Sequence, residues 1–296
     1  MAKYLDPKAD LTFKKVFGEY ENLTISFLNA LLPLKKEIKS IKYLPSEMVP
    51  DNPLKKNSIV DVRCTDHDGR QFIVEMQMIW SDEFKHRVLF NASKAYVRQL
   101  GKSKRYELLH PVYSLNLVNE IFEKNSDKYY YNYHIVCDED SNLVIDGLHL
   151  IFVELPKFKP QTITDKKMMA LWLRFLTEID EQTQEVSPEL VADENIKEAL
   201  ELVEQSAFTD AQMDAYDRFW DAVRVEKALV AEGERRRKKI MEEGFAKGRA
   251  EGRAEGRTEG RTEGIILVAK TMKQNGFSVA DIIKATNLLE EEINSL

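Results

Sequence analysis

The sequence is poor in residues that cross-link a chain, cross a membrane or bind zinc. Its two cysteines, Cys64 and Cys137, lie far apart and form no CxxC motif. No apolar run reaches the roughly 18 residues of a membrane span, and the charged residues 1–10 lack the apolar stretch of a signal peptide. The five histidines form no HExxH or Cys/His zinc pattern. These absences argue against a disulfide-rich secreted domain and a membrane protein, and they favour a reducing, cytoplasmic setting.

Charge of both signs is abundant but unevenly distributed. The 296 residues include 43 Lys and Arg against 50 Asp and Glu, for a net charge of −7, which argues weakly against nucleic-acid binding. However, residues 177–234 carry a net −13 and residues 111–176 a net −2, whereas residues 1–110 carry +5 and residues 235–296 carry +3. The acidic segment therefore hides a basic N-terminal block, which suits an anionic partner.

The apolar pattern predicts an α/β protein with an αβββαβ order and a mixed sheet between helices. Asp10 suits the N-cap of the first helical segment, Pro33 its end and Gly18 a break within it. The predicted helices are residues 11–32, 81–100, 166–179, 188–208 and from 210 onward, and the predicted strands are residues 38–44, 58–65, 71–79, 112–122, 129–136 and 148–155.

Two carboxylates stand inside otherwise apolar strands. Asp61 interrupts residues 59–62 and Glu75 interrupts residues 72–76, on either side of a turn with strong Asp-Gly chemistry. A charged group there is costly unless it is paired or binds a cation. Strand parity places Gln77 on the face of Glu75, and two carboxylates beside an amide suit Mg²⁺. The alternative is that Asp61 and Glu75 simply face solvent on an amphipathic strand.

The spacing of these residues resembles a known nuclease pattern. Asp61 followed by Glu75-Met-Gln77 resembles the D…ExK core of the PD-(D/E)XK nuclease superfamily, with Gln in place of Lys. From about residue 5 to about residue 160 the chain is similar to the Rpn family of recombination-promoting nucleases, whose members are also called transposases. Five segments carry this resemblance: Asp10-Leu-Thr-Phe-Lys-Lys-Val-Phe-Gly18, Phe27-Leu-Asn-Ala-Leu31, Ile59-Val-Asp-Val-Arg-Cys64, Phe72-Ile-Val-Glu-Met-Gln77, and Arg87 with Ser93-Lys-Ala-Tyr96.

The resemblance implies a restriction-endonuclease-like core and a catalytic site. Asp61 and Glu75 would bind Mg²⁺ or another divalent cation, and Gln77 would replace the lysine of the superfamily and orient the attacking water. Asp10 is the first choice for the N-terminal acid of the site, with Glu19 and Glu21 as rivals. A helix N-cap explains Asp10 equally well.

Basic residues follow the proposed site at helical spacing. Arg87, Lys94 and Arg98 recur at steps of seven and four residues and would form one stripe. Contact with the phosphates of double-stranded DNA is one interpretation, and a solvated helix face is the other. Further candidates with the same two interpretations are Lys55, Lys56, Lys102, Lys104 and Arg105.

A four-residue repeat marks the tail. Glycine recurs from Gly244 to Gly264 in the unit Gly-Arg-Ala/Thr-Glu, so arginines and glutamates form separate stripes on a helix. No repeat arginine has a glutamate three or four residues after it, and each glycine costs about 1 kcal/mol relative to alanine. The segment is therefore either a helix that pairs with a second copy or a semi-flexible spacer. Slippage of the DNA repeat would also create this period.

The last residues predict three short helical pieces. The first is residues 265–274, Ser278 begins the second, and Asn287, with Glu290 three residues later, begins the third. Residues 276–286 look like part of a helix-turn-helix, but the glutamates of the third helix disfavour DNA reading. We therefore expect a small oligomerisation element.

The predicted organisation has four parts: a nuclease-like domain at 1–160, an acidic helical region at 161–240, the repeat at 241–264 and the oligomerisation element at 265–296. The leading hypothesis is a cytoplasmic Mg²⁺-dependent DNA endonuclease, linked by resemblance to DNA recombination or mobile elements and assembled as a homo-oligomer through its C-terminal helices. The alternative is a catalytically inactive DNA-binding or protein-interaction module on a nuclease fold, which Gln77 in place of lysine keeps open.

Overall fold

The computed structural model describes residues 3–48, 58–101, 105–160 and 167–296. The predicted basic residues Lys55, Lys56, Lys102 and Lys104 lie outside these ranges. The chain forms two compact units, Met1–Lys227 and Ala228–Leu296. Within the described ranges, no helix is long and apolar enough to cross a membrane.

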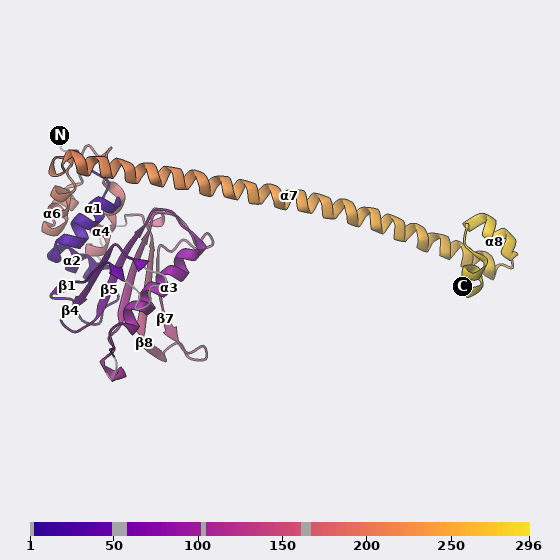
Figure 1. The fold of residues 1–296 in the computed structure, drawn as a ribbon, viewed down its shortest axis with the longest axis horizontal. Helices are drawn as coiled ribbons and strands as arrows, with labels where there is room; N and C mark the ends of the chain where they lie inside the picture. Colours follow the sequence, from indigo (N-terminus) through magenta and orange to yellow (C-terminus); the bar gives the residue numbers. More distant parts are fainter. Residues whose placement is uncertain (1–2, 49–57, 102–104, 161–166) are drawn as a thin grey trace. The chain divides into compact units, whose positions relative to one another are not determined.

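A six-stranded mixed sheet is the centre of the first unit, which confirms the predicted α/β class (Figure 1). Its strand order is β1-β4-β5-β6-β8-β7. The pairs β5–β6 and β6–β8 are parallel, and the other neighbouring pairs are antiparallel. The strands are β1 (Ile41–Tyr43), β4 (Val62–Asp66), β5 (Gln71–Gln77), β6 (Val112–Val118), β7 (Tyr130–Val136) and β8 (Val144–Glu154), and a separate antiparallel pair is β2 (Glu47–Met48) with β3 (Ser58–Ile59).

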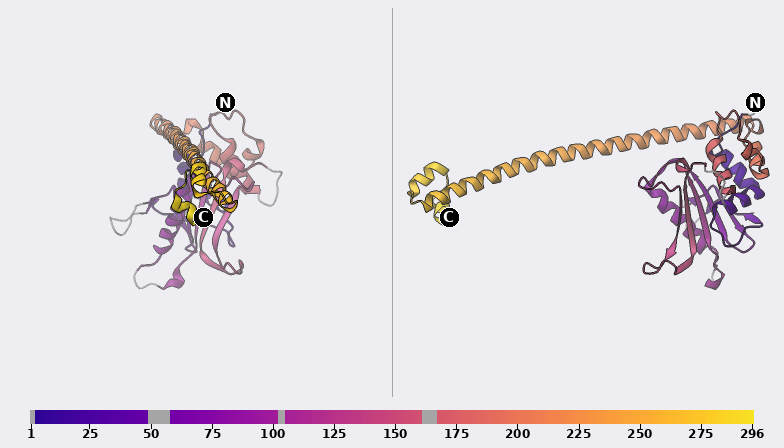
Figure 2. Two further views of the ribbon diagram at one scale, coloured as in Figure 1. Left: turned by 90° about the vertical axis from the view of Figure 1, so that its right-hand side faces the viewer. Right: turned by 180° about the vertical axis from the view of Figure 1, so that it is seen from behind.

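Helices cover both faces of the sheet. Figures 1 and 2 show α3 on one side and α1, α2, α4 and α6 on the other. The bounds are α1 (Asp10–Glu19), α2 (Glu21–Leu31), α3 (Asp82–Val97), α4 (Lys167–Glu178), α5 (Pro188–Val191), α6 (Glu194–Leu202), α7 (Asp210–Gln274), α8 (Val279–Thr286) and α9 (Glu290–Ser295). Because α3 connects the parallel strands β5 and β6, it is the crossover helix of a βαβ unit.

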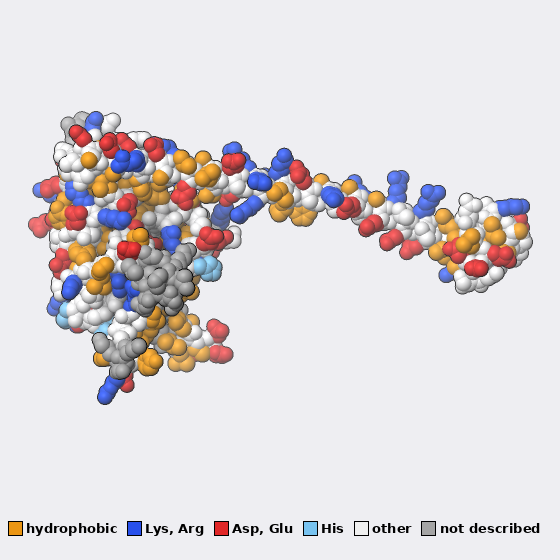
Figure 3. All heavy atoms as spheres, viewed as in Figure 1, with side chains coloured by type: hydrophobic (Ala, Val, Ile, Leu, Met, Phe, Trp, Pro, Cys, Tyr) orange, Lys and Arg blue, Asp and Glu red, His pale blue; other side chains and the backbone are white. Residues whose placement is uncertain are grey.

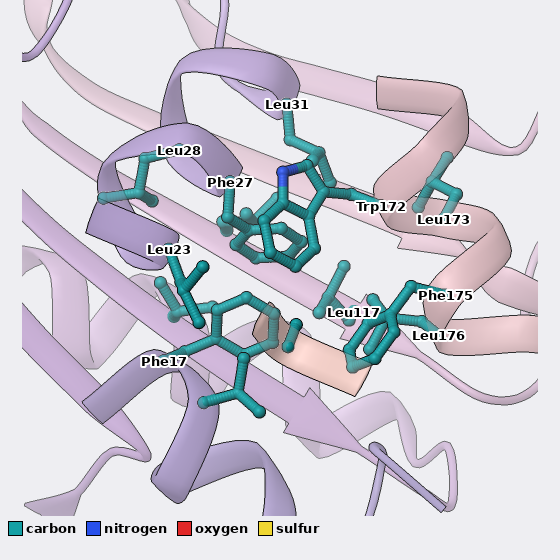
Figure 4. Packing of buried hydrophobic residues seen from close by; sticks show 14 of the residues in the cluster. Phe17, Leu23, Phe27, Leu28, Leu31, Leu117, Trp172, Leu173, Phe175 and Leu176 are labelled. Carbon is teal, nitrogen blue, oxygen red and sulfur yellow. The ribbon is translucent and has the colours of Figure 1, made fainter. Parts of the chain in front are cut away.

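The larger hydrophobic core lies under α1, α2, α4 and α6. Trp172 of α4 packs against Phe17 and Phe27, with ring centroids 5.4 and 5.5 Å apart (Figure 4). The indole N–H of Trp172 donates to the hydroxyl of Ser26 at 3.1 Å, so its polar atom is satisfied. Residues after 160 therefore share one core with the predicted nuclease-like segment.

Several predicted boundaries are wrong, and local hydrogen bonds explain the differences. The break between α1 and α2 falls at Tyr20 rather than Gly18, because the Thr24 hydroxyl donates to the Phe17 carbonyl at 2.7 Å and closes the end of α1. The N-cap of α1 is Ala9, and Asp10 lies in the first turn, where it pairs with Lys14 at 2.6 Å.

Two segments predicted as continuous are divided. The strand predicted at 58–65 is split into β3 and β4 around Asp61, whose carboxylate accepts a hydrogen bond from the Met76 backbone N–H at 2.7 Å. The helix predicted at 188–208 is split because the Asp193 carboxylate accepts from the N–H groups of Asn195 and Ile196 and starts α6 anew.

The second unit ends in a small helical cluster. Ala269, Ile282 and Ile293 bury one another where the end of α7 meets α8 and α9, and Ser278 caps α8 as predicted. Asn287 does not begin the last helix: it is the left-handed C-cap of α8, with φ 57°. Leu289 is the N-cap of α9, and its backbone N–H donates to Glu292 rather than to Glu290.

Candidate active site

The sheet register brings the two predicted carboxylates together. Val62 of β4 is opposite Val74 of β5, so extending this antiparallel register by one residue sets Asp61 opposite Glu75. The hydrogen bond from the Met76 N–H to Asp61 holds the end of this pairing in place. The break between β3 and β4 thus lies at the candidate site, and Asp61 belongs to neither strand.

Glu75 is buried beneath α3. Its Oε1 accepts a hydrogen bond from the side-chain amide of Asn91 at 3.0 Å, and its Oε2 lies 3.8 Å from Nη2 of Arg87. Burial raises the pKa of Glu75 to about 7, against the lowering effects of Asn91 and Arg87 and with a raising effect from Asp61. Glu75 is therefore a carboxyl group near its titration point at neutral pH, and a nearby divalent cation would favour its ionised form.

Burial also raises the pKa of Asp61. The hydrogen bond from the Met76 N–H lowers this pKa, and so do the charges of Lys14 and Arg87. The charge of Asp10 raises it further. The charge of Asp61 disfavours ionisation of Glu75, and the charge of Asp10 disfavours ionisation of Asp61, an environment that a cation would relieve. Carboxyl groups with raised pKa values of this kind cluster at functional sites.

Gln77 uses both ends of its side chain. Its amide nitrogen donates to the backbone carbonyl of Ile79 at 2.6 Å, and its Oε1 accepts from Nη2 of Arg87 at 2.5 Å. An amide has two donor hydrogens and two acceptor lone pairs, so one of each is left for a water molecule. Gln77 lies two residues after Glu75 on β5, as the sequence pattern predicted.

Asn91 is a site residue that the sequence reasoning missed. It is fully buried on α3, one helical turn after Arg87, and its amide donates to Glu75. Its Oδ1 is buried and accepts no hydrogen bond within the described part of the chain. The available signal was an asparagine on the apolar face of α3, beside Val88, Ala92 and Ala95.

The three candidate N-terminal acids lie in different surroundings. Asp10 is exposed in the first turn of α1, and its charge acts on Asp61. Glu21 instead accepts a hydrogen bond from the Ile41 N–H at 2.9 Å, and it acts with Glu19 on the hydroxyl of Tyr43. The surroundings therefore favour Asp10, although its pairing with Lys14 leaves it on the rim rather than between the two other carboxylates.

The predicted basic stripe follows α3. Of its three members, Arg87 lies beside Glu75, with Nη2 3.8 Å from Oε2. The ammonium of Lys94 donates to the Met48 carbonyl, and Arg98, the C-cap of α3, lies near Arg63 of β4, whose pKa is lowered by burial and by the charge of Arg98. These side chains add positive charge along the α3 side of the sheet.

The chemistry of the donors fits a hard divalent cation. Within the described residues there is no group of three or more His, Cys, Asp and Glu side chains that would hold a metal. Mg²⁺, however, commonly takes only one or two carboxylates from a protein and completes its shell with waters and substrate phosphates. Asp61 and Glu75 would supply the two carboxylates, and the Oδ1 of Asn91, which has no hydrogen-bond partner among the described residues, would accept a hydrogen bond from an ordered water.

The chain matches a known protein family. Residues 7–233 match the model of a family described as PD-(D/E)XK nuclease family transposase. Neither a curated protein nor a solved structure matches the chain significantly. The matched segment extends beyond the 5–160 resemblance and includes the helices that pack on the shared core.

Proposed function

The chain belongs to the PD-(D/E)XK nuclease family transposases, and from this membership we propose that it is a Mg²⁺-dependent DNA endonuclease acting in DNA recombination or mobile-element biology. The observation that carries the proposal is the pairing of Asp61 with the buried Glu75, whose pKa is raised to about 7. Ionising two adjacent carboxyl groups costs free energy when no cation is near. With a divalent cation bound, the same pair would support phosphodiester hydrolysis.

Each residue of the candidate site would have a separate role. Asp61 and Glu75 would hold the divalent cation, which supplies Lewis-acid stabilisation of phosphodiester hydrolysis when it is bound. Asn91 holds Glu75 in its orientation through the 3.0 Å hydrogen bond. Gln77 keeps one donor and one acceptor for the attacking water, and Asp10 completes the acidic rim.

Double-stranded DNA is the proposed substrate, and the cytoplasm is the proposed location. The basic residues on α3 and at its end lie on the side of the sheet that holds Glu75. Lys94 and Arg98 would neutralise backbone phosphates, which gives affinity without reading sequence.

An isosteric substitution tests the assignment of the site. Asp61→Asn keeps an oxygen for the Met76 N–H but removes the charge, so we expect Mg²⁺-dependent nicking of supercoiled plasmid to fall at least 100-fold. Asp68→Asn is the matched control on the same hairpin, because Asp68 pairs with Lys36 in the turn and should leave cleavage unchanged.

Two results would contradict the proposal. Cleavage by Asp61→Asn at the wild-type rate would remove Asp61 from the site. A wild-type protein that shifts DNA in a gel but cuts it with neither Mg²⁺ nor Mn²⁺ would establish the binding module instead.

We also propose that the repeat in α7 pairs two copies of the chain. At 100° per residue, the arginine stripe lies about 100° to one side of the glycine stripe and the glutamate stripe about 60° to the other. In a parallel pair packed through glycine, each arginine side therefore adjoins the partner's glutamate side, as g and e positions do in a parallel coiled coil. Figure 3 shows charges of both signs along α7.

Charge reversal tests this pairing in the full chain. Changing Arg249, Arg253, Arg257 and Arg261 together to Glu should convert a dimer into a monomer in light scattering, whereas changing them to Lys should not. The same mass for all three proteins would contradict pairing through the repeat.

A further inference from the structure

The proposed site needs a positive charge that β5 does not supply. Asp61 and Glu75 are acidic, Gln77 is neutral, and a DNA phosphate that approaches them is itself anionic. One divalent cation neutralises part of this charge, but the pentacoordinate phosphorus of the transition state carries additional negative charge. A cationic side chain beside the carboxylates would stabilise that charge.

We infer that Arg87 of α3 is this cation, and that Gln77 acts chiefly by positioning it. This inference rests on the proposed nuclease function. Nη2 of Arg87 lies 2.5 Å from Oε1 of Gln77 and 3.8 Å from Oε2 of Glu75. The guanidinium therefore donates a hydrogen bond to Gln77 and lies beside Glu75, the two side chains that form the β5 part of the site.

The surroundings of Arg87 hold the guanidinium without burying it. Its central carbon lies 4.8 Å from the ring centroid of Phe84, a buried residue one turn earlier on α3. The hydrogen bond from Gln77 to the Ile79 carbonyl fixes the amide, so its oxygen stays directed at Arg87. The Arg87 side chain is nevertheless 51% exposed, which leaves it accessible to a phosphate.

The chemistry of a guanidinium limits its role. Arginine remains protonated in proteins and presents five N–H donors, so Arg87 cannot serve as a general base. With one Nη2 contact made to Gln77, donors remain for the non-bridging oxygens of a phosphate, which guanidinium binds in a bidentate manner. During hydrolysis, the water oxygen forms a new P–O bond as the bond from phosphorus to the leaving oxygen breaks. The proton that the water loses balances the proton that the leaving oxygen gains, and Arg87 exchanges none.

A neighbouring cation on α3 has different surroundings. Lys85 is two residues away on the same helix, but its ammonium lies over the rings of Trp80 and Phe122, at 5.4 and 4.9 Å from their centroids. It therefore provides a matched control with the same charge, the same helix and a different neighbourhood. A general loss of positive charge on α3 would affect both residues, whereas a specific role would affect Arg87.

The experiment separates chemistry from DNA binding in the full-length protein. Single-turnover cleavage at saturating DNA with Mg²⁺ gives the rate, and a gel shift with Ca²⁺ in place of Mg²⁺ gives the Kd. We expect Arg87→Ala to lower the rate about 100-fold, as for loss of one transition-state donor, with the Kd raised less than about fivefold. Arg87→Lys should retain part of the rate, and Lys85→Ala should match wild type.

A compensating change tests the charge itself. In Arg87→Ala combined with Gln77→Lys, the cation returns from β5, and we expect at least a tenfold recovery of the rate over Arg87→Ala alone. Because Gln77 acts chiefly through Arg87, Gln77→Ala should cost less in the Arg87→Ala background than in the wild-type protein, the remainder being its hydrogen bond to the attacking water. Thermal unfolding of each variant checks that the fold is retained.

The outcomes distinguish this inference from the proposed function. If the wild-type protein cleaves and Arg87→Ala cleaves equally fast, or if Arg87→Ala changes only the Kd, the inference is wrong and the nuclease proposal stands. If Arg87→Ala loses activity without recovery by Gln77→Lys, the charge argument fails. If the wild-type protein cleaves with no divalent cation, the proposed function and this inference both fail.

Discussion

The sheet unit, Met1–Lys227, and the repeat within α7 use the same residue types in opposite ways. In the sheet unit, tertiary packing buries Glu75 and surrounds it with an amide, a guanidinium and a second carboxylate. In the repeat, arginines and glutamates are exposed along one continuous helix. Charged residues acquire unusual chemistry only where packing removes water and fixes their neighbours.

The glycines of the two regions also differ in their surroundings. Gly69 sits at φ +84° in the turn between β4 and β5, and a Cβ there would lie 2.7 Å from the ring of His110. A Cβ on Gly252 or Gly256 would meet no atom of the described residues within 4 Å. The first glycine is required by contacts within its own chain, whereas no contact of this kind requires the repeat glycines, which suits the proposed pairing of two copies.

The largest effect on stability is expected in the core of the sheet unit. Trp172→Ala removes a fully buried indole and should lower the free energy of unfolding by about 3–5 kcal/mol. Phe245→Ala, which truncates a side chain that is 72% exposed on α7, should change it by less than about 0.5 kcal/mol. Denaturation followed by circular dichroism compares the two, and equal losses would show that α7 is as tightly packed as the sheet.

The next effect depends on pH and tests the buried carboxyl group. The pKa of Glu75 is about 7 in the folded protein against 4.5 ordinarily, so the folded state holds more protons between these values and stability falls as pH rises through this window. In EDTA, Glu75→Gln should therefore be more stable than wild type at pH 8, by roughly 3 kcal/mol at about 1.4 kcal/mol per pKa unit.

At pH 4 this advantage should nearly disappear, because Glu75 is then mostly protonated in both states. Thermal unfolding at both pH values measures the difference, and Glu251→Gln in the exposed repeat is the control. An advantage of Glu75→Gln that does not change with pH would mean that its charge is not what destabilises the site.

A smaller effect is expected at the turn. Gly69→Ala combines a left-handed backbone with the close approach of His110 and should cost about 2 kcal/mol. Gly18→Ala is the matched control within α1, where a Cβ would make ordinary contacts at 4.0 Å and favour the helix. Tryptophan fluorescence reports on the sheet unit, since Trp80, Trp172 and Trp220 all lie there. A neutral Gly69→Ala would refute the proposed strain.

The smallest effect should have the opposite sign. At concentrations where the chain is monomeric, Gly252→Ala should stabilise the α7 helix by about 1 kcal/mol, because alanine is the better helix former and nothing obstructs its methyl group. Amide hydrogen exchange across residues 244–264 measures this gain, and Ala254→Gly should reverse it. Weaker protection in Gly252→Ala would indicate that the repeat glycines have a neighbour even in the monomer.

Much of the site followed from local sequence rules. Strand parity placed Gln77 with Glu75, and the Asp-Gly turn placed β4 against β5 in the register that sets Asp61 opposite Glu75. Both rules act over a few residues, so they hold before any tertiary contact forms. The predicted αβββαβ order with helices on both faces is confirmed for the same reason.

The errors arose where a single residue restarts or ends a helix. The carboxylate of Asp193 starts α6 inside a segment with continuous helical periodicity, and Asn287 adopts a left-handed conformation that ends α8. Hydrogen bonds of this kind are worth about 1 kcal/mol each and leave no mark on an apolar pattern. Asn91 was missed because its partner, Glu75, lies sixteen residues away across a helix–sheet contact.

The sequence by itself determined the α/β order, the hairpin, the resemblance to a nuclease family and the four-residue stripes of the tail, since each depends on spacing along the chain. Only the tertiary structure decided that Glu75 is buried, that Asn91 and Arg87 reach it from α3, and that Gln77 is tied to Arg87. The reason is that burial and charge proximity depend on distances between separate elements, which α3 establishes only by packing across β5, β6 and β8.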